Sequence, residues 1–278
     1  MKTTIRKYPL CSFFLLAFAL TWWAVPLGGF LPIGPLAAAL IVTAITEGRA
    51  GLRRLGRSML PPRLRARWYF IAFALPVGVM TAAFSVNLAL GAPIDALGRL
   101  DAWYVLLAIT ASRMIDPLDG PLGEEPGWRG FALPRMLADH SPVKASLLLG
   151  TIVAAWHIPL VFLAAEKLPP LFLVATVAVT FVYTWLYLRT NGSVFMTMLA
   201  HASEGTIKIG ALGLVGAAST RMTVLYTACW CVLALGLVAL DRKTWAAGSG
   251  RTGGANRRPA VLALQTSRAE ASSAAPNP

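Results

Sequence analysis

The apolar run PPLFLVATVAVTFVYTWLYLR, residues 169–189, decides the fold class of this chain. It carries no charged side chain before Arg189, and it matches the roughly 20 residues that a helix needs to cross a lipid bilayer. Comparable runs recur at about 10–29, 32–47, 68–91, 102–117, 144–164, 169–189, 193–216 and 221–240. Just before the fifth run, Ser141 and Pro142 are typical of an N-cap and a first helical residue. The sequence therefore predicts an all-α, polytopic bundle of about eight transmembrane helices.

The composition of the whole chain supports this fold class. Of its 278 residues, 56% are hydrophobic and 13% are charged, whereas about 25% of an ordinary soluble domain is charged. The mean hydropathy is +0.63, and no polar stretch between the runs is long enough for a separate soluble domain. We therefore expect one membrane domain over residues 1–245. Residues 246–278 are rich in Gly, Ser, Ala, Arg and Pro and are predicted to form a disordered cytoplasmic tail.

The positive charge of the chain is placed as in a membrane protein. The net charge is +13, but the densest group of arginines lies between two apolar runs with no aromatic stacking platform, which argues against a nucleic-acid groove. These arginines are Arg49, Arg53, Arg54, Arg57, Arg63, Arg65 and Arg67. They suit a cytoplasmic connection that faces anionic membrane lipids. We expect a multi-pass protein of the cell membrane, in a bacterial inner membrane, with the N-terminus inside and the first helix retained rather than cleaved as a signal peptide.

Two adjacent carboxylates follow the fourth apolar run, in GEEPGWRG, residues 123–130. In a low dielectric Glu124 and Glu125 would resist joint ionisation unless a cation compensates. Arg129 lies four residues after Glu125 and therefore on the same helical face, where it can neutralise that carboxylate. Glu124 is then about 100° away around the helix and faces something else. The pattern predicts one structural and one reactive carboxylate, although a solvated helix end is an alternative.

Two histidines lie in later apolar runs, His157 in WHIPL and His201 in MLAHASEG. Ionisable side chains are costly inside a bilayer and are therefore functional candidates. A carboxylate such as Glu124 can take a proton from water, while two imidazoles orient the water and stabilise the oxyanion. The same three side chains would also suit zinc. The alternatives are a helix-to-helix hydrogen bond at His157 and a self-satisfied pair of His201 with Glu204, which makes Glu204 the main rival of Glu124.

These three segments, in this order, resemble the motifs of the CPBP/Abi family of intramembrane proteases, relatives of the type 2 CAAX prenyl endopeptidase. The resemblance covers about residues 10 to 240. The first family motif, EExxxR, is matched in full by Glu124, Glu125 and Arg129.

The second and third family motifs are matched in part. In FxxxH the histidine is His157, and Val153 stands at the position of the Phe. In HxxxN the histidine is His201, and Gly205 stands at the position of the Asn, which in the family is thought to help hold the oxyanion. The neighbouring Glu204 and Ser203 are the candidates to supply that hydrogen bond, the Glu only when protonated.

The resemblance implies a function as well as a fold. It implies peptide-bond hydrolysis in a cavity that opens to the cytoplasmic leaflet, with Glu124 activating water and Glu125, Arg129, His157 and His201 assisting. The expected partner is a peptide or protein substrate from the cytoplasmic face, with zinc as a possible cofactor. A non-catalytic membrane protein of the same fold, for bacteriocin immunity or scaffolding, is the alternative that the glycine in the third motif favours. A proton-coupled transporter is a more distant one, since no inverted repeat is visible.

Overall fold

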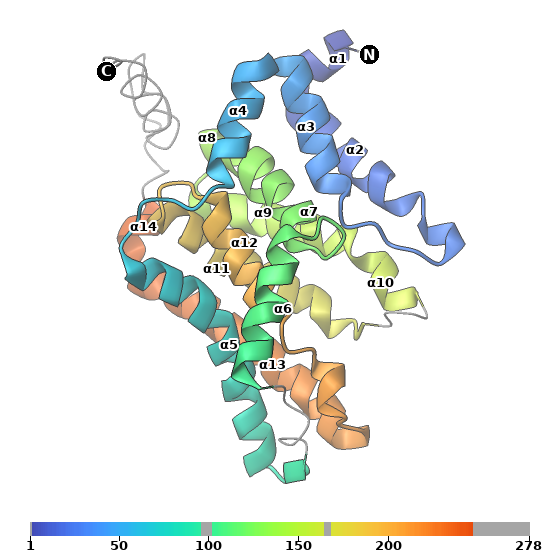
Figure 1. Ribbon diagram of the computed structural model, residues 1–278, viewed down its shortest axis with the longest axis vertical. Helices are drawn as coiled ribbons and strands as arrows, with labels where there is room; N and C mark the ends of the chain where they lie inside the picture. The colour runs from blue at the N-terminus through green and yellow to red at the C-terminus, as the bar shows by residue number, and fades with distance from the viewer. Residues whose placement is uncertain (1, 96–101, 164–167, 247–278) are drawn as a thin grey trace.

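The computed structural model describes residues 2–95, 102–163 and 168–246, and every regular element in these ranges is helical (Figure 1). The predicted all-α helix bundle is confirmed. The tail predicted for residues 246–278 lies outside the described residues, apart from Ala246, which ends the last helix.

The elements follow one another as helices joined by short connections. The α-helices are α1 Lys2–Lys7, α2 Pro9–Trp22, α3 Gly34–Thr46, α4 Gly48–Ser58, α5 Ala66–Ala89, α6 Trp103–Ile115, α7 Pro121–Glu125, α8 Leu133–Asp139, α9 Pro142–Trp156, α10 Ile158–Phe162, α11 Leu171–Arg189, α12 Val194–Glu204, α13 Gly216–Leu240 and α14 Arg242–Ala246. The segments η1 Val25–Leu27 and η4 Ile209–Leu212 are 3₁₀ turns, and η3 Pro126–Ala132 is a π-helix.

Each of the eight predicted runs contains a helix, but within the described residues four helical segments are long and apolar enough to cross a membrane by length and composition. These are Pro9–Leu27, Ala66–Ala89, Leu171–Arg189 and Gly216–Leu240. Helices α3, α6 and α9 are apolar but shorter. The fifth run is broken where α9 ends and α10 begins, because Pro159 lacks an amide hydrogen and clashes with the preceding turn. The seventh run ends early, with Gly205 as the C-cap of α12.

The helices enclose two apolar cores. One is built mainly by α5, α11, α12 and α13, and the other by α2, α3, α9 and the segment from η3 to α8. In the second core Trp128 is fully buried, with its ring centroid 5.5 Å from those of Phe13 and Trp156. The first motif is thus anchored in the core, and α12 contacts α5 on one side and α7 on the other.

The first motif passes unusually close to the start of α3. A Cβ on Gly127 would lie 2.6 Å from the backbone oxygen of Pro35, and one on Gly123 would lie 2.6 Å from the backbone oxygen of Pro32. Only glycine permits such an approach of two backbones. The π-helix η3 begins directly after the paired carboxylates, and single π turns often occur at functional sites.

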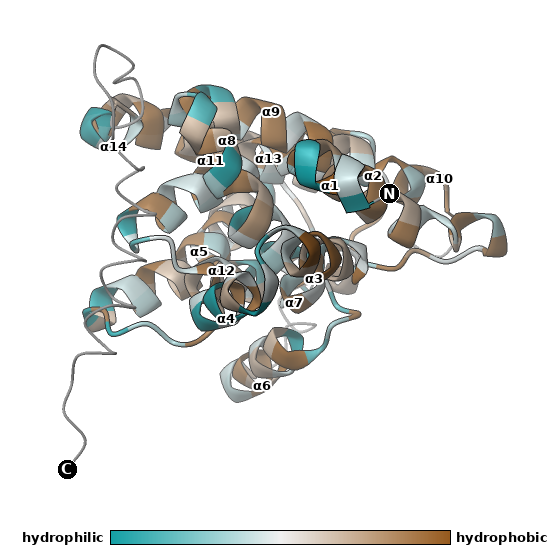
Figure 2. Cartoon of the chain, turned by 90° about the horizontal axis from the view of Figure 1, so that it is seen from above, coloured by the Kyte–Doolittle hydropathy of each residue, from teal (hydrophilic) through white to brown (hydrophobic). Residues whose placement is uncertain are grey.

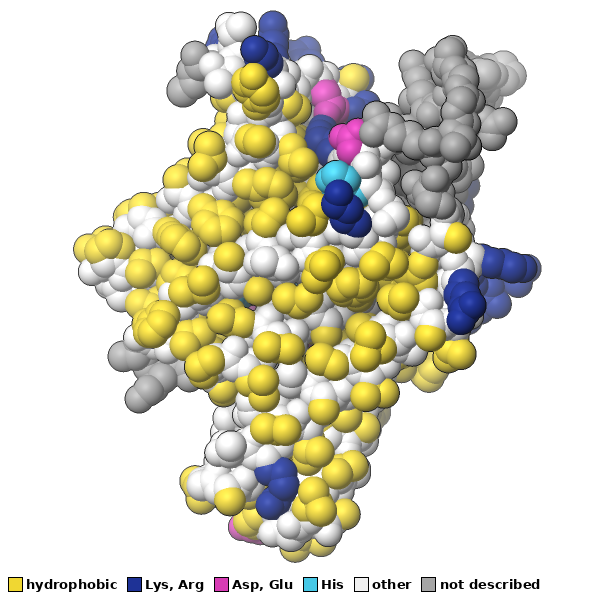
Figure 3. Space-filling model, turned by 180° about the vertical axis from the view of Figure 1, so that it is seen from behind, with side chains coloured by type: hydrophobic (Ala, Val, Ile, Leu, Met, Phe, Trp, Pro, Cys, Tyr) yellow, Lys and Arg dark blue, Asp and Glu magenta, His cyan; other side chains and the backbone are white. Residues whose placement is uncertain are grey.

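The outer surface has the character of a membrane protein. Figure 3 shows a broad apolar face with basic residues toward its edges, and large side chains such as Leu15, Phe70, Phe162 and Val232 are each at least 70% exposed. Hydrophilic residues are concentrated on α1, α4 and α14 (Figure 2). Water would oppose so large an exposed apolar surface, whereas lipid tails cover it. Together with the apolar helices this makes the chain a multi-pass membrane protein.

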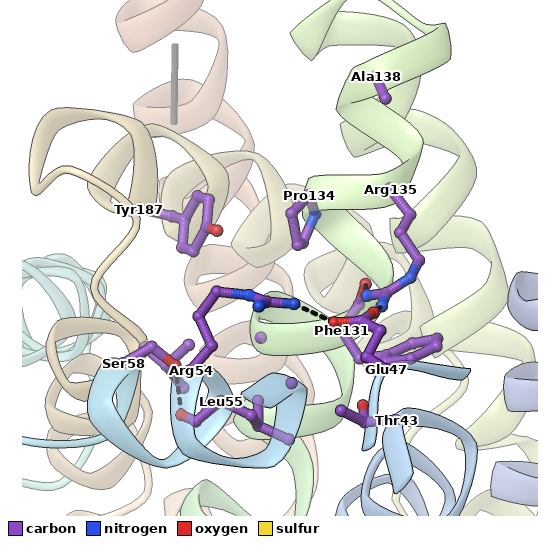
Figure 4. Close-up of a pocket in the computed structure, with 13 residues that line it drawn as sticks. Thr43, Glu47, Arg54, Leu55, Ser58, Phe131, Pro134, Arg135, Ala138 and Tyr187 are labelled. Atoms are coloured by element: carbon purple, nitrogen blue, oxygen red, sulfur yellow. Dashed lines mark hydrogen bonds and ion pairs between the residues drawn. The ribbon is translucent and has the colours of Figure 1, made fainter. Parts of the chain in front are cut away.

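The basic connection between α3 and α5 is largely the amphipathic helix α4. Its buried residues are Gly51 and Leu55, and Arg53 faces outward. Glu47, at the start of α4, forms ion pairs with Arg54 and with Arg135 of α8 (Figure 4). We call Glu47, Arg54 and Arg135 the basic-end cluster. They border a cavity of about 340 Å³.

Candidate active site

All five predicted site residues line one cavity of about 560 Å³. Glu124 and Glu125 come from α7, and Arg129 comes from the π-helix η3. His157 is the residue between α9 and α10, and His201 lies in the last turns of α12. Three separate chain segments, the continuous α7–η3 stretch, the link between α9 and α10, and α12, therefore converge on the cavity, which lies between the two apolar cores.

Glu125 is the structural carboxylate of the site. Its side chain is fully buried, and Arg129 Nη1 donates to Glu125 Oε1 at 2.8 Å. This confirms the pairing that the spacing predicts. His201 Nδ1 lies 3.0 Å from the same oxygen and acts as the donor, because a carboxylate paired with an arginine only accepts. Arg129 is held further by Thr180 Oγ1, 3.3 Å from Nη2, and by the ring of Tyr183.

Glu124 is arranged differently. It is 5% exposed, and no Lys or Arg of the described residues forms an ion pair with it. Its Oε2 is 4.0 Å from His157 Nε2. The other ring nitrogen of His157 lies 2.8 Å from the carbonyl oxygen of Val153 and must donate to it, so in the neutral ring Nε2 carries the lone pair.

Gly120 leaves open a small space between the reactive groups. A Cβ at Gly120 would lie 3.2 Å from Glu124 Oε1 and 3.3 Å from His201 Nε2. Its φ of +73° also favours glycine. The space next to this α-carbon is thus bordered by the Glu124 carboxylate and by Nε2 of His201. The second imidazole nitrogen, Nε2 of His157, lies 4.0 Å from Oε2 of the same carboxylate. A water molecule there would reach groups that can accept its hydrogens.

Glu204 lines the cavity but is not the partner of His201. It accepts hydrogen bonds from the hydroxyl groups of Tyr183 and Tyr226, the second at 2.9 Å. The predicted alternative of a self-satisfied pair with His201 is therefore wrong, since that imidazole binds Glu125. Because two phenol hydroxyls donate to the Glu204 carboxylate, they fix its position, and we do not treat it as a rival base.

Comparison with known proteins agrees with this geometry. Residues 103–206 match the family model described as type II CAAX prenyl endopeptidase Rce1-like, and this range contains every motif residue. Over this segment the chain is similar to the CPBP/CAAX protease family. The curated CAAX prenyl protease 2 of Methanococcus maripaludis is 27% identical over 88 residues, which cover 28% of this chain. The match spans 32% of the length of that relative.

The sequence departs from the second family motif at Val153, and the structure supplies aromatic contacts to His157 from elsewhere. The ring of His157 packs edge-to-face against Phe172, with centroids 5.5 Å apart, and against Trp156 at 4.7 Å. Its orientation is further set by the backbone oxygen of Val153, which any residue at that position provides. The substitution leaves the imidazole in place.

Beside the third motif lies a residue that sequence reasoning missed, Arg113. A Cβ on Gly205 would lie 2.3 Å from Nη2 and 2.4 Å from Cζ of Arg113, so the guanidinium fills the space beside the glycine. Ser203 is occupied elsewhere, since its hydroxyl donates to the carbonyl oxygen of Ala200 at 2.9 Å. Arg113 was not among the predicted site residues. The available signal was an arginine in the last turn of an apolar helix, with Asp119 as a nearby partner.

The predicted zinc ligands Glu124, His157 and His201 do not form a metal site as they lie. Each histidine does bind a backbone or carboxylate oxygen through Nδ1, as metal-ligating histidines do. Within the described ranges, however, no three His, Cys, Asp or Glu side chains are grouped so as to hold a metal ion. We therefore derive no catalytic step that uses a metal.

Proposed function

We propose that this chain is an intramembrane endopeptidase that hydrolyses a peptide bond with a water molecule activated by Glu124. The observation that carries the proposal is the contrast between two adjacent carboxylates in one cavity. Glu125 is bound to Arg129 and His201, whereas Glu124 forms no ion pair with a Lys or Arg of the described residues and lies 4.0 Å from Nε2 of His157. A buried carboxylate without a paired cation is suited to accept a proton.

The reaction balances with Glu124 as the single proton carrier. The water oxygen bonds to the carbonyl carbon, Glu124 takes one water proton, and the carbonyl electron pair moves to its oxygen. When the carbon–nitrogen bond breaks, Glu124 returns the proton to the leaving amine. One new carboxyl end and one new amine end are released, and Glu124 is regenerated.

The neighbouring residues position the water and the base. His157, held through Nδ1, accepts a hydrogen bond from the water at Nε2 and so directs the other water hydrogen toward Glu124. Glu125 and Arg129 do not take part in proton transfer. They fix the ring of His201 at the other side of the space next to Gly120.

The substrate class follows from the relative and from the lining of the cavity. The relative is named a CAAX prenyl protease, so a prenylated C-terminal peptide is the first substrate to test. Apolar side chains such as Met80, Phe172 and Val179 share the cavity with the charged groups, which suits a substrate with an apolar chain next to the scissile bond. We place the end that carries α1, α4 and α8 in the cytoplasm, and the substrate enters from that side.

The test is cleavage of fluorogenic peptides, with and without a C-terminal prenyl group, by purified protein in proteoliposomes. Glu124→Gln keeps the shape of the side chain and should lower kcat by about 10²-fold or more, because general-base catalysis contributes that much. Glu47→Gln is the matched control, since this glutamate lines the other cavity and not the one that holds Glu124. A chelator should leave the rate unchanged, and inverted membrane vesicles should cleave added peptide while right-side-out vesicles should not.

Cleavage by Glu124→Gln at the wild-type rate would overturn the assignment of the base. Failure of the wild type to cleave any peptide of the panel would count against the protease itself. The non-catalytic alternative rested on Gly205 in the third motif, and the guanidinium that fills the adjacent space weakens that ground.

A further inference from the structure

In their neutral forms the two imidazoles offer no hydrogen at Nε2 to the negative oxygen that the proposed reaction creates. His157 and His201 both use Nδ1 as the donor, toward a backbone oxygen and a carboxylate respectively. In a neutral ring the remaining nitrogen, Nε2, then has a lone pair and no hydrogen. Stabilising an oxyanion requires a preorganised N–H or O–H donor, which in many hydrolases is a large part of the rate enhancement.

Arg113 is a buried cation in the same cavity. It is 7% exposed and reaches inward from the last turn of α6, a helix at the edge of the bundle (Figure 2). Two of its three nitrogens are fixed: Nε donates to the carbonyl oxygen of Ala202 at 3.1 Å, and Nη1 donates to Asp119 at 2.7 Å. The third, Nη2, donates no hydrogen bond to any residue in the described part of the chain.

The position of Nη2 depends on Gly205. A Cβ there would lie 2.3 Å from this nitrogen, so any side chain at position 205 would displace the guanidinium. Gly205 follows His201 by four residues and therefore lies one turn further along α12. It is thus beside the His201 imidazole, whose Nε2 borders the space next to Gly120. The glycine and the arginine are thus complementary: one leaves the space that the other fills.

We propose that Arg113 is a catalytic residue of this site, whose Nη2 hydrogens bind the oxyanion that forms on the substrate carbonyl. The inference rests on the proposed peptidase function. The guanidinium donates hydrogen bonds without changing its own protonation, so the proton balance stays with Glu124. Asp119 and the carbonyl oxygen of Ala202 hold Nε and Nη1, which leaves Nη2 preorganised for the substrate.

The experiment measures kcat and KM for five variants in the peptide assay. Arg113→Met keeps most of the side-chain volume and removes all donors, and it should lower kcat by about 10²-fold to 10³-fold with little change in KM. Arg113→Lys should retain part of the lost rate. Gly205→Asn alone should be impaired, because the new side chain meets the guanidinium. Arg113→Ala combined with Gly205→Asn should be faster than Arg113→Ala, because the amide enters the vacated space and donates in its place.

The control is Arg221→Met, which removes a partly buried arginine that binds Asn87 outside the cavity. It should leave kcat unchanged. Wild-type kcat in Arg113→Met would overturn the assignment, and so would equal rates for Arg113→Ala and its combination with Gly205→Asn. If Glu124→Gln is inactive while Arg113→Met is fully active, this inference fails and the peptidase function stands. If Glu124→Gln is fully active, the proposed mechanism itself fails.

Discussion

The described part of the chain contains two clusters in which one glutamate binds two basic side chains, and they differ chiefly in burial. In the cavity Glu125 binds Arg129 and His201, and the glutamate and arginine side chains are 0% and 3% exposed. In the basic-end cluster Glu47 binds Arg54 and Arg135, with side chains that are 27%, 41% and 28% exposed (Figure 4).

The two clusters therefore have different roles, although both pair a glutamate with basic side chains. A charge inside the protein is costly unless it is paired, so the loss of one partner of Glu125 leaves an uncompensated buried carboxylate. Near water the same loss is relieved by hydration and by salt. The buried cluster can fix the orientation of His201, whereas the exposed cluster can do little more than fasten α4 to α8.

The largest expected effect is that of Arg129→Ala. It leaves Glu125 fully buried without its cation and should lower the free energy of unfolding by about 3–5 kcal/mol. Thermal unfolding in detergent would measure this change. The double variant Glu125→Gln with Arg129→Met, which removes both charges, should recover much of the loss. If the single variant were as stable as the wild type, the buried pair would not contribute as the comparison requires.

A second pair of variants tests how rigid each side of η3 is. A Cβ on Gly127 would meet the backbone of Pro35 at 2.6 Å, which has no means of moving away. A Cβ on Gly130 would meet the Leu55 side chain of α4 at 2.6 Å, and that side chain can rotate. We expect Gly127→Ala to cost about 1–3 kcal/mol of unfolding free energy, as overpacking does, and Gly130→Ala to cost less. Equal costs in the same unfolding measurement would contradict the contrast.

The sequence predicted the parts of the fold that depend on local pattern. Hydropathy located the four long spans, and Ser141 and Pro142 form the N-cap and first turn of α9, as their types predict. It did not predict that α12 would stop at Glu204. An apolar run predicts burial or lipid contact, but where a helix ends also depends on packing against its neighbours.

The candidate site was likewise predictable where it depends on local spacing and not where it depends on contacts between distant segments. The spacing of Glu125 and Arg129 predicted their ion pair, because both lie on one turn of one segment. For His201 local spacing suggested only Glu204, three residues away, as an alternative partner; the actual partner Glu125 comes from a distant segment, and such contacts leave no trace in local spacing. Arg113 was missed for the same reason, because it reaches the space beside Gly205 from another helix.

The smallest expected effect is that of Glu47→Gln, which removes the carboxylate charge shared by Arg54 and Arg135. Partly exposed ion pairs contribute about 0–1 kcal/mol each, so the unfolding free energy should change little and kcat should stay at the wild-type value. The small difference should shrink further as salt is raised, because exposed charges are screened. The effect of Arg129→Ala should persist at the same ionic strength. A salt-resistant loss of several kcal/mol in Glu47→Gln would mean that the basic-end cluster is as firmly built as the cavity, and burial would then not be what separates them.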